Sequence, residues 1–144
     1  MKRFVFFIFL SILFSACQKS IAHTPQVCLQ ETCFNVEIAK EESQILRGLQ
    51  GRSALASDQG MLFVFSSSYR YVFWMKDTLI PLDMIWLDYA RQVVHIEKNV
   101  LPCKNDPCPT YQPKSEALYV LEINAGLADA NQIVLGDHFD FKLE

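Results

Sequence analysis

The chain is 144 residues long, 51% hydrophobic and 20% charged, with a formal net charge of −3. This length supports one domain with one core but not two domains, and the apolar content excludes a disordered chain. An acidic chain without a basic run argues against a nucleic-acid partner and against electrostatic docking on anionic lipid.

The N-terminus has the pattern of an export signal. Lys2 and Arg3 precede an apolar run over residues 4–14. This run is too short to span a membrane, which needs roughly 20 residues. We therefore expect residues 1–16 to be a signal peptide, whose removal would change the formal net charge from −3 to −5 because Lys2 and Arg3 leave with it.

Cys17 is predicted to carry a lipid anchor. Residues 14–17, Phe-Ser-Ala-Cys, resemble the lipobox of bacterial lipoproteins, and this resemblance implies diacylation of the sulfur, cleavage before Cys17 and acylation of the new amino group. The alternative is an ordinary signal peptide followed by an unrelated cysteine. Three acyl chains exceed what stable anchoring requires, so we expect a lipoprotein facing the periplasm, with residues 17–26 as anchor and polar tether. The residue that follows Cys17 is Gln18 and not Asp, which implies sorting to the outer membrane if the source has two membranes.

Four further cysteines form two C-x4-C spacings, Cys28 with Cys33 and Cys103 with Cys108. Export places them in an oxidising compartment, where three pairings are possible. We favour the two local disulfides, because a two-residue turn at 30–31 would place Cys28 opposite Cys33 in a hairpin. A zinc site or a redox pair is the alternative, but both normally use shorter C-x2-C spacings.

The next segments predict a strand and a helix. Residues 33–39 alternate apolar and polar side chains, which is typical of a half-buried strand. Residues 41–52 place Ile45, Leu46 and Leu49 on one side, with two glutamates at the start and Gly51 near the end, so a short amphipathic helix is expected there.

The middle of the chain contains continuous apolar runs at 61–65, 71–75 and 84–87. Such runs indicate strands covered on both faces. Serines 66–68 predict a loop between the first two, and Pro81 predicts a bend before the third.

Further strands are predicted at 93–100, at 118–123 and toward the end of 133–143, with a Pro-rich, disulfide-closed loop over 101–115 and a short helical turn within 125–131. These elements together predict an α+β, mostly β fold. About eight strands would form a barrel- or sandwich-like domain over 27–144, with one short amphipathic helix.

Several stretches resemble one bacterial and archaeal family. Residues 73–84, FWMKDTLIPLDM, resemble the central signature of the domain of unknown function 192 family, and residues 48–52, 60–65, 120–126 and 136–137 resemble its other segments in the same order. The resemblance extends over roughly residues 36–141 and implies a mostly β domain with a short helix. The family's activity is not established, so membership supplies no reaction. Gln50 and Asp77 stand where the family usually has Met and Asn, and Asp77 adds a negative charge to the signature.

Three charged residues near this signature could carry chemistry. Lys76 could bind a carboxylate or phosphate, or form an ion pair with Asp77, Asp83 or Glu122. Glu122 lies in an apolar run, where a carboxylate is costly unless it has a partner. It could be a general acid or base with a raised pKa, a buried partner of Lys76, Arg47 or Arg52, or an outward-facing strand residue. Asp83 could line a pocket, or accept backbone N–H groups at a turn.

Other classes of site lack their sequence patterns. His95 lies within a predicted strand, and no histidine or cysteine is spaced to complete a metal site with it. There is no nucleophile elbow and no phosphate-binding glycine loop. We expect no metal and no cofactor.

These observations favour a non-catalytic binding or accessory module for a small polar or saccharide-like ligand, or for an envelope protein. The site would be a concave patch formed by Trp74, Lys76, Thr78, Asp83 and Glu122. One alternative is a small hydrolase or lyase that uses Asp83 or Glu122 as acid and base, including a two-carboxylate glycosidase. A second alternative is a structural envelope protein without a small ligand.

Overall fold

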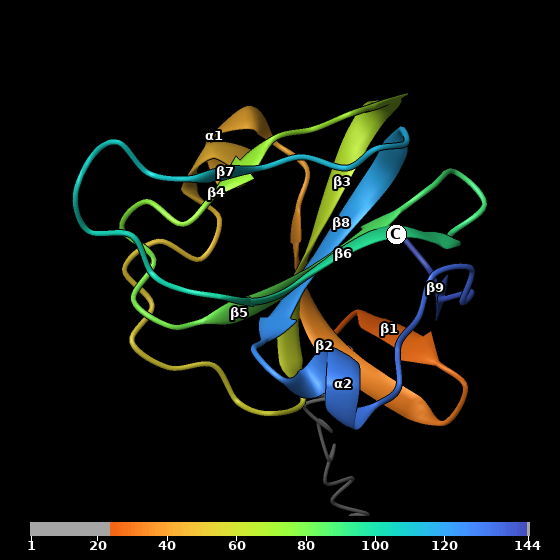
Figure 1. The fold of residues 1–144 in the computed structure, drawn as a ribbon. Coiled ribbons are helices and arrows are strands. Elements are labelled where there is room, and N and C mark those ends of the chain that lie inside the picture. Colours follow the sequence, from red (N-terminus) through yellow and green to blue (C-terminus); the bar gives the residue numbers. More distant parts are fainter. Residues whose placement is uncertain (1–23, 144) are drawn as a thin grey trace, which may run out of the picture.

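A curled seven-stranded sheet dominates the computed structural model, which describes residues 24–143 (Figure 1). Its strand order is β6-β5-β8-β3-β2-β1-β9, and β4 and β7 form a separate two-stranded sheet. The predicted mostly β fold is thus confirmed, with nine strands and two short helices among the described residues. Their bounds are β1 Gln26–Leu29, β2 Thr32–Ala39, α1 Glu42–Arg47, β3 Gln59–Tyr69, β4 Phe73–Trp74, β5 Leu82–Leu87, β6 Val93–Val100, β7 Thr110–Tyr111, β8 Ala117–Asn124, α2 Leu127–Ala130 and β9 Asp140–Phe141.

The N-terminal hairpin forms as predicted. β1 and β2 pair antiparallel with Cys28 opposite Cys33, and residues 30–31 make the turn. The two cysteines are disulfide-bonded with Cα atoms 4.0 Å apart, and Cys103 is bonded to Cys108. Both local pairings favoured from the spacing are therefore present. The expected signal peptide, Cys17 and most of the tether lie outside the described residues.

The three central strands are buried because apolar layers cover both faces of the sheet. Along β8, Tyr119, Leu121 and Ile123 belong to one core cluster, whereas Val120 belongs to the other. This alternation follows from the period of two along a strand. The first cluster includes Phe34, Ile85 and Phe139, and the second includes Met61, Met84 and Trp86. We call the two sides the Ile123 face and the Met84 face.

Helix α1 is shorter than predicted. It covers Glu42–Arg47 instead of 41–52, and it begins with a capping box in which the Glu41 N–H donates to Gln44 Oε1. Gly48 ends it with φ = 48°, a left-handed value that favours glycine. Residues 48–51 therefore turn back toward the sheet, which buries Leu49 but leaves Leu46 exposed.

Two predictions for the middle of the chain were wrong. β3 continues through the serines to Tyr69, with a shift in register after Val64, instead of ending in a loop. Residues 71–75 do not form a core strand, since only Phe73–Trp74 pair, and they pair with β7. This segment instead covers the Met84 face through aromatic contacts, in which Phe73 packs edge-on against Phe63 and Trp86.

The chain ends with less strand than expected. Of residues 133–143, only Asp140–Phe141 form a strand, which pairs with β1 at the edge of the sheet. Helix α2 is the short turn predicted within 125–131. Figure 1 shows α2 at the opposite end of the domain from α1, which lies beside β4 and β7.

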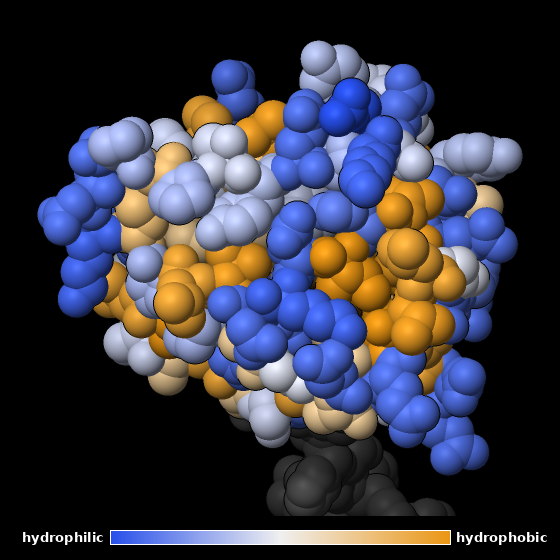
Figure 2. Space-filling model, viewed as in Figure 1, coloured by the Kyte–Doolittle hydropathy of each residue, from blue (hydrophilic) through white to orange (hydrophobic). Residues whose placement is uncertain are grey.

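Some large apolar side chains remain on the surface, and Figure 2 shows apolar residues gathered on part of one face with hydrophilic residues around them. Val134 and Leu135 are both exposed and border a shallow depression with His95 and Lys98. Exposed apolar residues are common on folded domains, so this patch does not by itself define a site. No helix within 24–143 has the length and apolar character needed to cross a membrane.

Candidate functional site

Glu122 lies in the middle of the sheet on the Met84 face. It stands on β8 directly between Met61 of β3 and Met84 of β5. Its neighbours along the strand, Leu121 and Ile123, point to the other face, so the period of two places the carboxyl group under α1 and β4. Only 4% of Glu122 is exposed.

A small cavity of about 40 Å³ opens above Glu122. A cavity needs roughly 10–15 Å³ to hold one water molecule, so this cavity admits a small group of a few atoms. Its wall is formed by the end of α1 and the turn after it, by aromatic residues of β3 and β4, and by the turn after β4. The lining residues are Ile45, Leu46, Arg47, Gly48, Leu49, Gln50, Phe63, Phe73, Trp74, Thr78 and Glu122.

The carboxyl group of Glu122 has no hydrogen-bond or ion-pair partner among residues 24–143. Two of the three predicted partners are engaged elsewhere, since Arg52 pairs with Glu37 and Lys76 pairs with Asp106. The third, Arg47, lines the same cavity but forms no ion pair with Glu122. Burial without a partner penalises the charged form and raises the pKa of Glu122 to about 8. At neutral pH the group is therefore largely a neutral carboxylic acid that faces a cavity.

Thr78 is the second polar residue brought to this cavity. It is 5% exposed, and its N–H donates to the Met75 carbonyl in a tight turn. Asp77 precedes it with φ = 57°, and its carbonyl accepts the Gly51 N–H. Asn and Asp are the non-glycine residues that best tolerate this left-handed conformation, so an acidic residue can replace the usual Asn of the signature without changing the turn.

Trp74 and Lys76 lie outside the cavity floor. Trp74 lines the cavity but is 49% exposed, and the Lys76 ammonium lies 5.6 Å from the centre of its ring. Lys76 Nζ donates to Asp106 at 2.7 Å, and this hydrogen bond, with the charge of Asp106, raises the pKa of Lys76. The ion pair predicted with Asp77, Asp83 or Glu122 is therefore formed with Asp106 instead.

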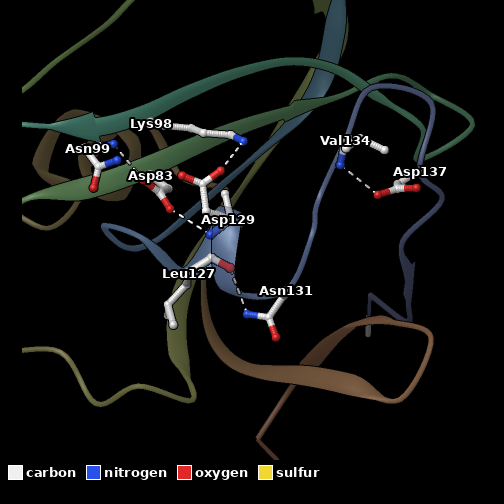
Figure 3. Close-up of polar contacts among 9 residues, drawn as sticks. Asp83, Lys98, Asn99, Leu127, Asp129, Asn131, Val134 and Asp137 are labelled. Carbon is white, nitrogen blue, oxygen red and sulfur yellow. Dashed lines mark hydrogen bonds and ion pairs between the residues drawn. The ribbon is translucent and has the colours of Figure 1, made fainter.

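Asp83 is not part of this site. It stands opposite Ile123 on β5 and is fully buried on the other face of the sheet. One carboxylate oxygen accepts the Asn99 N–H at 2.7 Å and the other accepts the Ala128 N–H at 2.8 Å (Figure 3). It therefore joins β5 to β6 and to α2, which matches the alternative that Asp83 accepts backbone N–H groups. Because the sheet separates Asp83 from Glu122, the two cannot act together as an acid and base on one substrate.

Residues 24–141 match the DUF192 family, described as an uncharacterized ACR. The chain belongs to the DUF192 family. The resemblance found in the signature residues is thus confirmed for nearly all of the domain, and the family adds no activity.

Two solved structures are similar to this DUF192 domain. One is a protein of unknown function from Novosphingobium aromaticivorans, with a TM-score of 0.74 and 31% identity over 81% of this chain and 83% of that one. The other is a candidate transcription regulator from Sinorhizobium meliloti, with a TM-score of 0.74 and 29% identity over 81% of this chain and 91% of that one. The comparison with curated proteins found no match.

Sequence reasoning missed most of the cavity wall of the DUF192 domain. Phe63 and Phe73 were assigned to core strands, and Gly48 was noted only as part of the resemblance. Gly48 is needed because its φ is positive and because a Cβ atom there would lie 3.2 Å from the Phe63 ring. The one sequence feature that could have indicated this wall is Gly48, a glycine that lies next to the apolar residues of the predicted helix.

No group of three or more His, Cys, Asp or Glu side chains within 24–143 is arranged to hold a metal ion. His95 Nε2 lies 2.9 Å from Glu97 Oε1 on the same strand. The site of this domain is therefore a carboxyl group in a small aromatic-walled cavity, suited to binding one polar group.

Proposed function

We propose that this DUF192 domain is a binding module of the bacterial cell envelope that holds a small polar or saccharide-like ligand at the Glu122 cavity. One observation carries the proposal: Glu122 is almost fully buried, has no partner among the described residues, and faces a cavity. No fully buried side-chain polar atom within 24–143 lacks a partner, so the Glu122 oxygens keep contact with solvent through the cavity, and a bound ligand would replace that solvent with a direct hydrogen bond.

The shape of the site supports a ligand that inserts one group while the remainder stays outside. The cavity of about 40 Å³ is too small for a sugar ring, so a saccharide-like ligand would place a single polar substituent next to Glu122 and Thr78. Trp74 at the rim offers an aromatic face for the rest of the molecule.

The location in the envelope rests on the export pattern and on Cys17, which we propose to be lipidated. The description of the Sinorhizobium meliloti relative names transcription. The acidic charge of this chain and its export leader favour an envelope role over nucleic-acid binding.

A thermal-shift screen tests the binding function. The purified, disulfide-intact protein is screened against envelope sugars, muropeptides, nucleotides, small carboxylates and small amines, with Glu122→Gln as the binding-site variant. A ligand at 100 times its Kd adds about 2.7 kcal/mol, which raises the Tm by several degrees. We expect a hit that Glu122→Gln abolishes and that the exposed control Glu116→Gln retains. Hits that Glu122→Gln leaves unchanged would contradict the assigned site.

A fractionation experiment tests the anchor. We expect the wild-type protein to sediment with membranes and to incorporate labelled palmitate, and Cys17→Ser to lose the label. Absence of the label from the wild-type protein would contradict lipidation at Cys17.

A further inference from the structure

Resting on the proposed function, we propose that the Glu122 cavity binds a primary ammonium group carried on an aliphatic chain, as in a lysine side chain or an alkylamine. The inference combines the charge at the floor of the cavity, the nature of its walls and the character of its rim.

The floor offers an acidic group that carries a negative charge once it is deprotonated, and no cation forms an ion pair with it among the described residues. Glu122 is the acidic residue that lines the cavity, and Thr78 adds a hydroxyl group beside it. From the strands on either side, the neighbours are the apolar Met61 and Met84. The other charged residue of the lining is Arg47, which is exposed at the end of α1.

The nearby charges of the signature do not neutralise Glu122. Lys76 is held by Asp106, and Arg52 is held by Glu37. Asp77 is not in the lining, although it precedes Thr78. When Glu122 is deprotonated, its carboxylate therefore lacks the positive partner that buried charges require.

The walls are aromatic, which suits a cation. Phe63 and Phe73 line the cavity and meet edge to face with ring centres 5.0 Å apart, and Trp74 adds a third ring. Aromatic faces attract ammonium groups, most strongly where water is excluded. An anionic ligand such as a phosphate would instead meet the Glu122 carboxyl group and the negative faces of the rings.

The size and the rim select an ammonium group on an apolar chain. A volume of about 40 Å³ accepts a group of the size of water or ammonium. At the rim, Leu46 is 68% exposed and Trp74 is 49% exposed. These side chains give the methylene groups of an aliphatic chain an apolar surface where it leaves the cavity.

Binding of n-butylammonium to the purified protein tests this proposal, with the neutral n-butanol as the matched probe. Because the pKa of Glu122 is about 8, the carboxylate fraction rises from about 1% at pH 6 to about 90% at pH 9. A lysine-like amine stays charged over this range, since its pKa is about 10.4. We expect the affinity for n-butylammonium, measured by calorimetry, to rise roughly 100-fold from pH 6 to pH 9, with release of nearly one proton per ligand at pH 6.

Two variants separate binding from folding. Glu122→Gln should remove both the binding and its pH dependence, while Glu116→Gln, at an exposed position, should retain both. Trp74→Ala alters a half-exposed residue, so it should fold, weaken binding severalfold and leave the pH profile unchanged.

The outcomes distinguish the two proposals. If n-butanol binds as tightly as n-butylammonium, or if affinity does not rise with pH, the ammonium proposal is overturned while a polar ligand at Glu122 stands. If neither these probes nor any screened compound binds in a Glu122-dependent way, both proposals are overturned.

Discussion

Asp83 and Glu122 are two buried carboxyl residues on adjacent strands, only one register position apart, yet their surroundings differ completely. Asp83 stands opposite Ile123 on one face and accepts two backbone N–H groups. Glu122 stands opposite Met84 on the other face and faces a cavity with no partner among the described residues. Two carboxyl groups with nearly the same burial can therefore differ completely in the number of hydrogen bonds that satisfy them.

The difference assigns a separate task to each face of the sheet. On the Ile123 face, Asp83 fixes α2 and β6 relative to β5, so its carboxylate stabilises the fold. On the Met84 face, the aromatic cover from β4 leaves a gap over Glu122, and its carboxyl group faces this gap without a hydrogen-bond partner among the described residues.

Removing the Asp83 carboxylate should have the largest effect. Asp83→Ala leaves the buried Ala128 N–H and the part-buried Asn99 N–H without an acceptor. A buried donor without an acceptor costs about 1–3 kcal/mol, so we expect a loss of about 3 kcal/mol in the free energy of unfolding. Urea denaturation at pH 7 measures it. Asp129→Ala, which removes only a surface ion pair with Lys98, serves as the control and should change little. A loss below 1 kcal/mol for Asp83→Ala would show that the two carboxyl groups are energetically alike.

Titration of Glu122 should give the next largest effect. Its folded-state pKa of about 8 exceeds the ordinary value of 4.5, so between these values the folded protein binds more protons than the unfolded protein. Ionisation of Glu122 therefore does not affect the free energy of unfolding below about pH 4.5. Between about pH 4.5 and pH 8 it lowers the free energy of unfolding progressively as the pH rises, and above about pH 8 this loss stays constant. The slope is at most about 1.4 kcal/mol per pH unit.

Urea denaturation from pH 5 to pH 9 checks this slope. Glu122→Gln should remove it and should be more stable than the wild type at pH 9. Equal slopes in the two proteins would mean that Glu122 has a partner in solution.

Replacing the Thr78 hydroxyl should have a smaller effect on stability. Thr78→Val keeps the shape of the side chain, and no side-chain hydrogen bond of Thr78 is present among residues 24–143. We expect the free energy of unfolding to change by less than about 1 kcal/mol, while the proposed binding of n-butylammonium at the Glu122 cavity should weaken. A large loss of stability would assign Thr78 to the core instead of the site.

Removing the Lys76 charge should have the smallest effect. Its ion pair with Asp106 is exposed to solvent, and such pairs contribute little to stability. Lys76→Ala should leave the midpoint of urea denaturation unchanged within error. A clear decrease would make the Lys76–Asp106 pair a structural feature comparable to Asp83.

Local patterns predicted much of the fold. The C-x4-C spacing and the two-residue turn were enough to place Cys28 opposite Cys33, because a hairpin register depends on residues close in sequence. The apolar runs at 61–65 and 84–87 correctly indicated strands covered on both faces, and the strand predicted at 118–123 is present. The run at 71–75 has the same composition but covers the sheet instead of joining it, since a run's composition does not specify its partners.

The candidate site was predicted only in part. The predicted patch of five residues contained Glu122, Thr78 and Trp74, which do line one cavity, and Lys76, which lies beside Trp74. Asp83 was included because it is close to the signature in sequence. A shift of one residue along a strand reverses the face to which a side chain points, and the relative register of β5 and β8 is not visible in either strand alone.

The sequence by itself determined the family, the mostly β fold, the two local disulfides and the presence of a carboxylate in an apolar strand, because each follows from residues within a short window. Only the tertiary structure decided what each carboxyl group does. The partners of Asp83 lie 16 and 45 residues away, and the cavity over Glu122 is walled by α1, β3 and β4. Whether hydrogen bonds compensate a buried carboxyl group for the loss of water depends on groups that are distant in sequence, and these come together only when the chain folds.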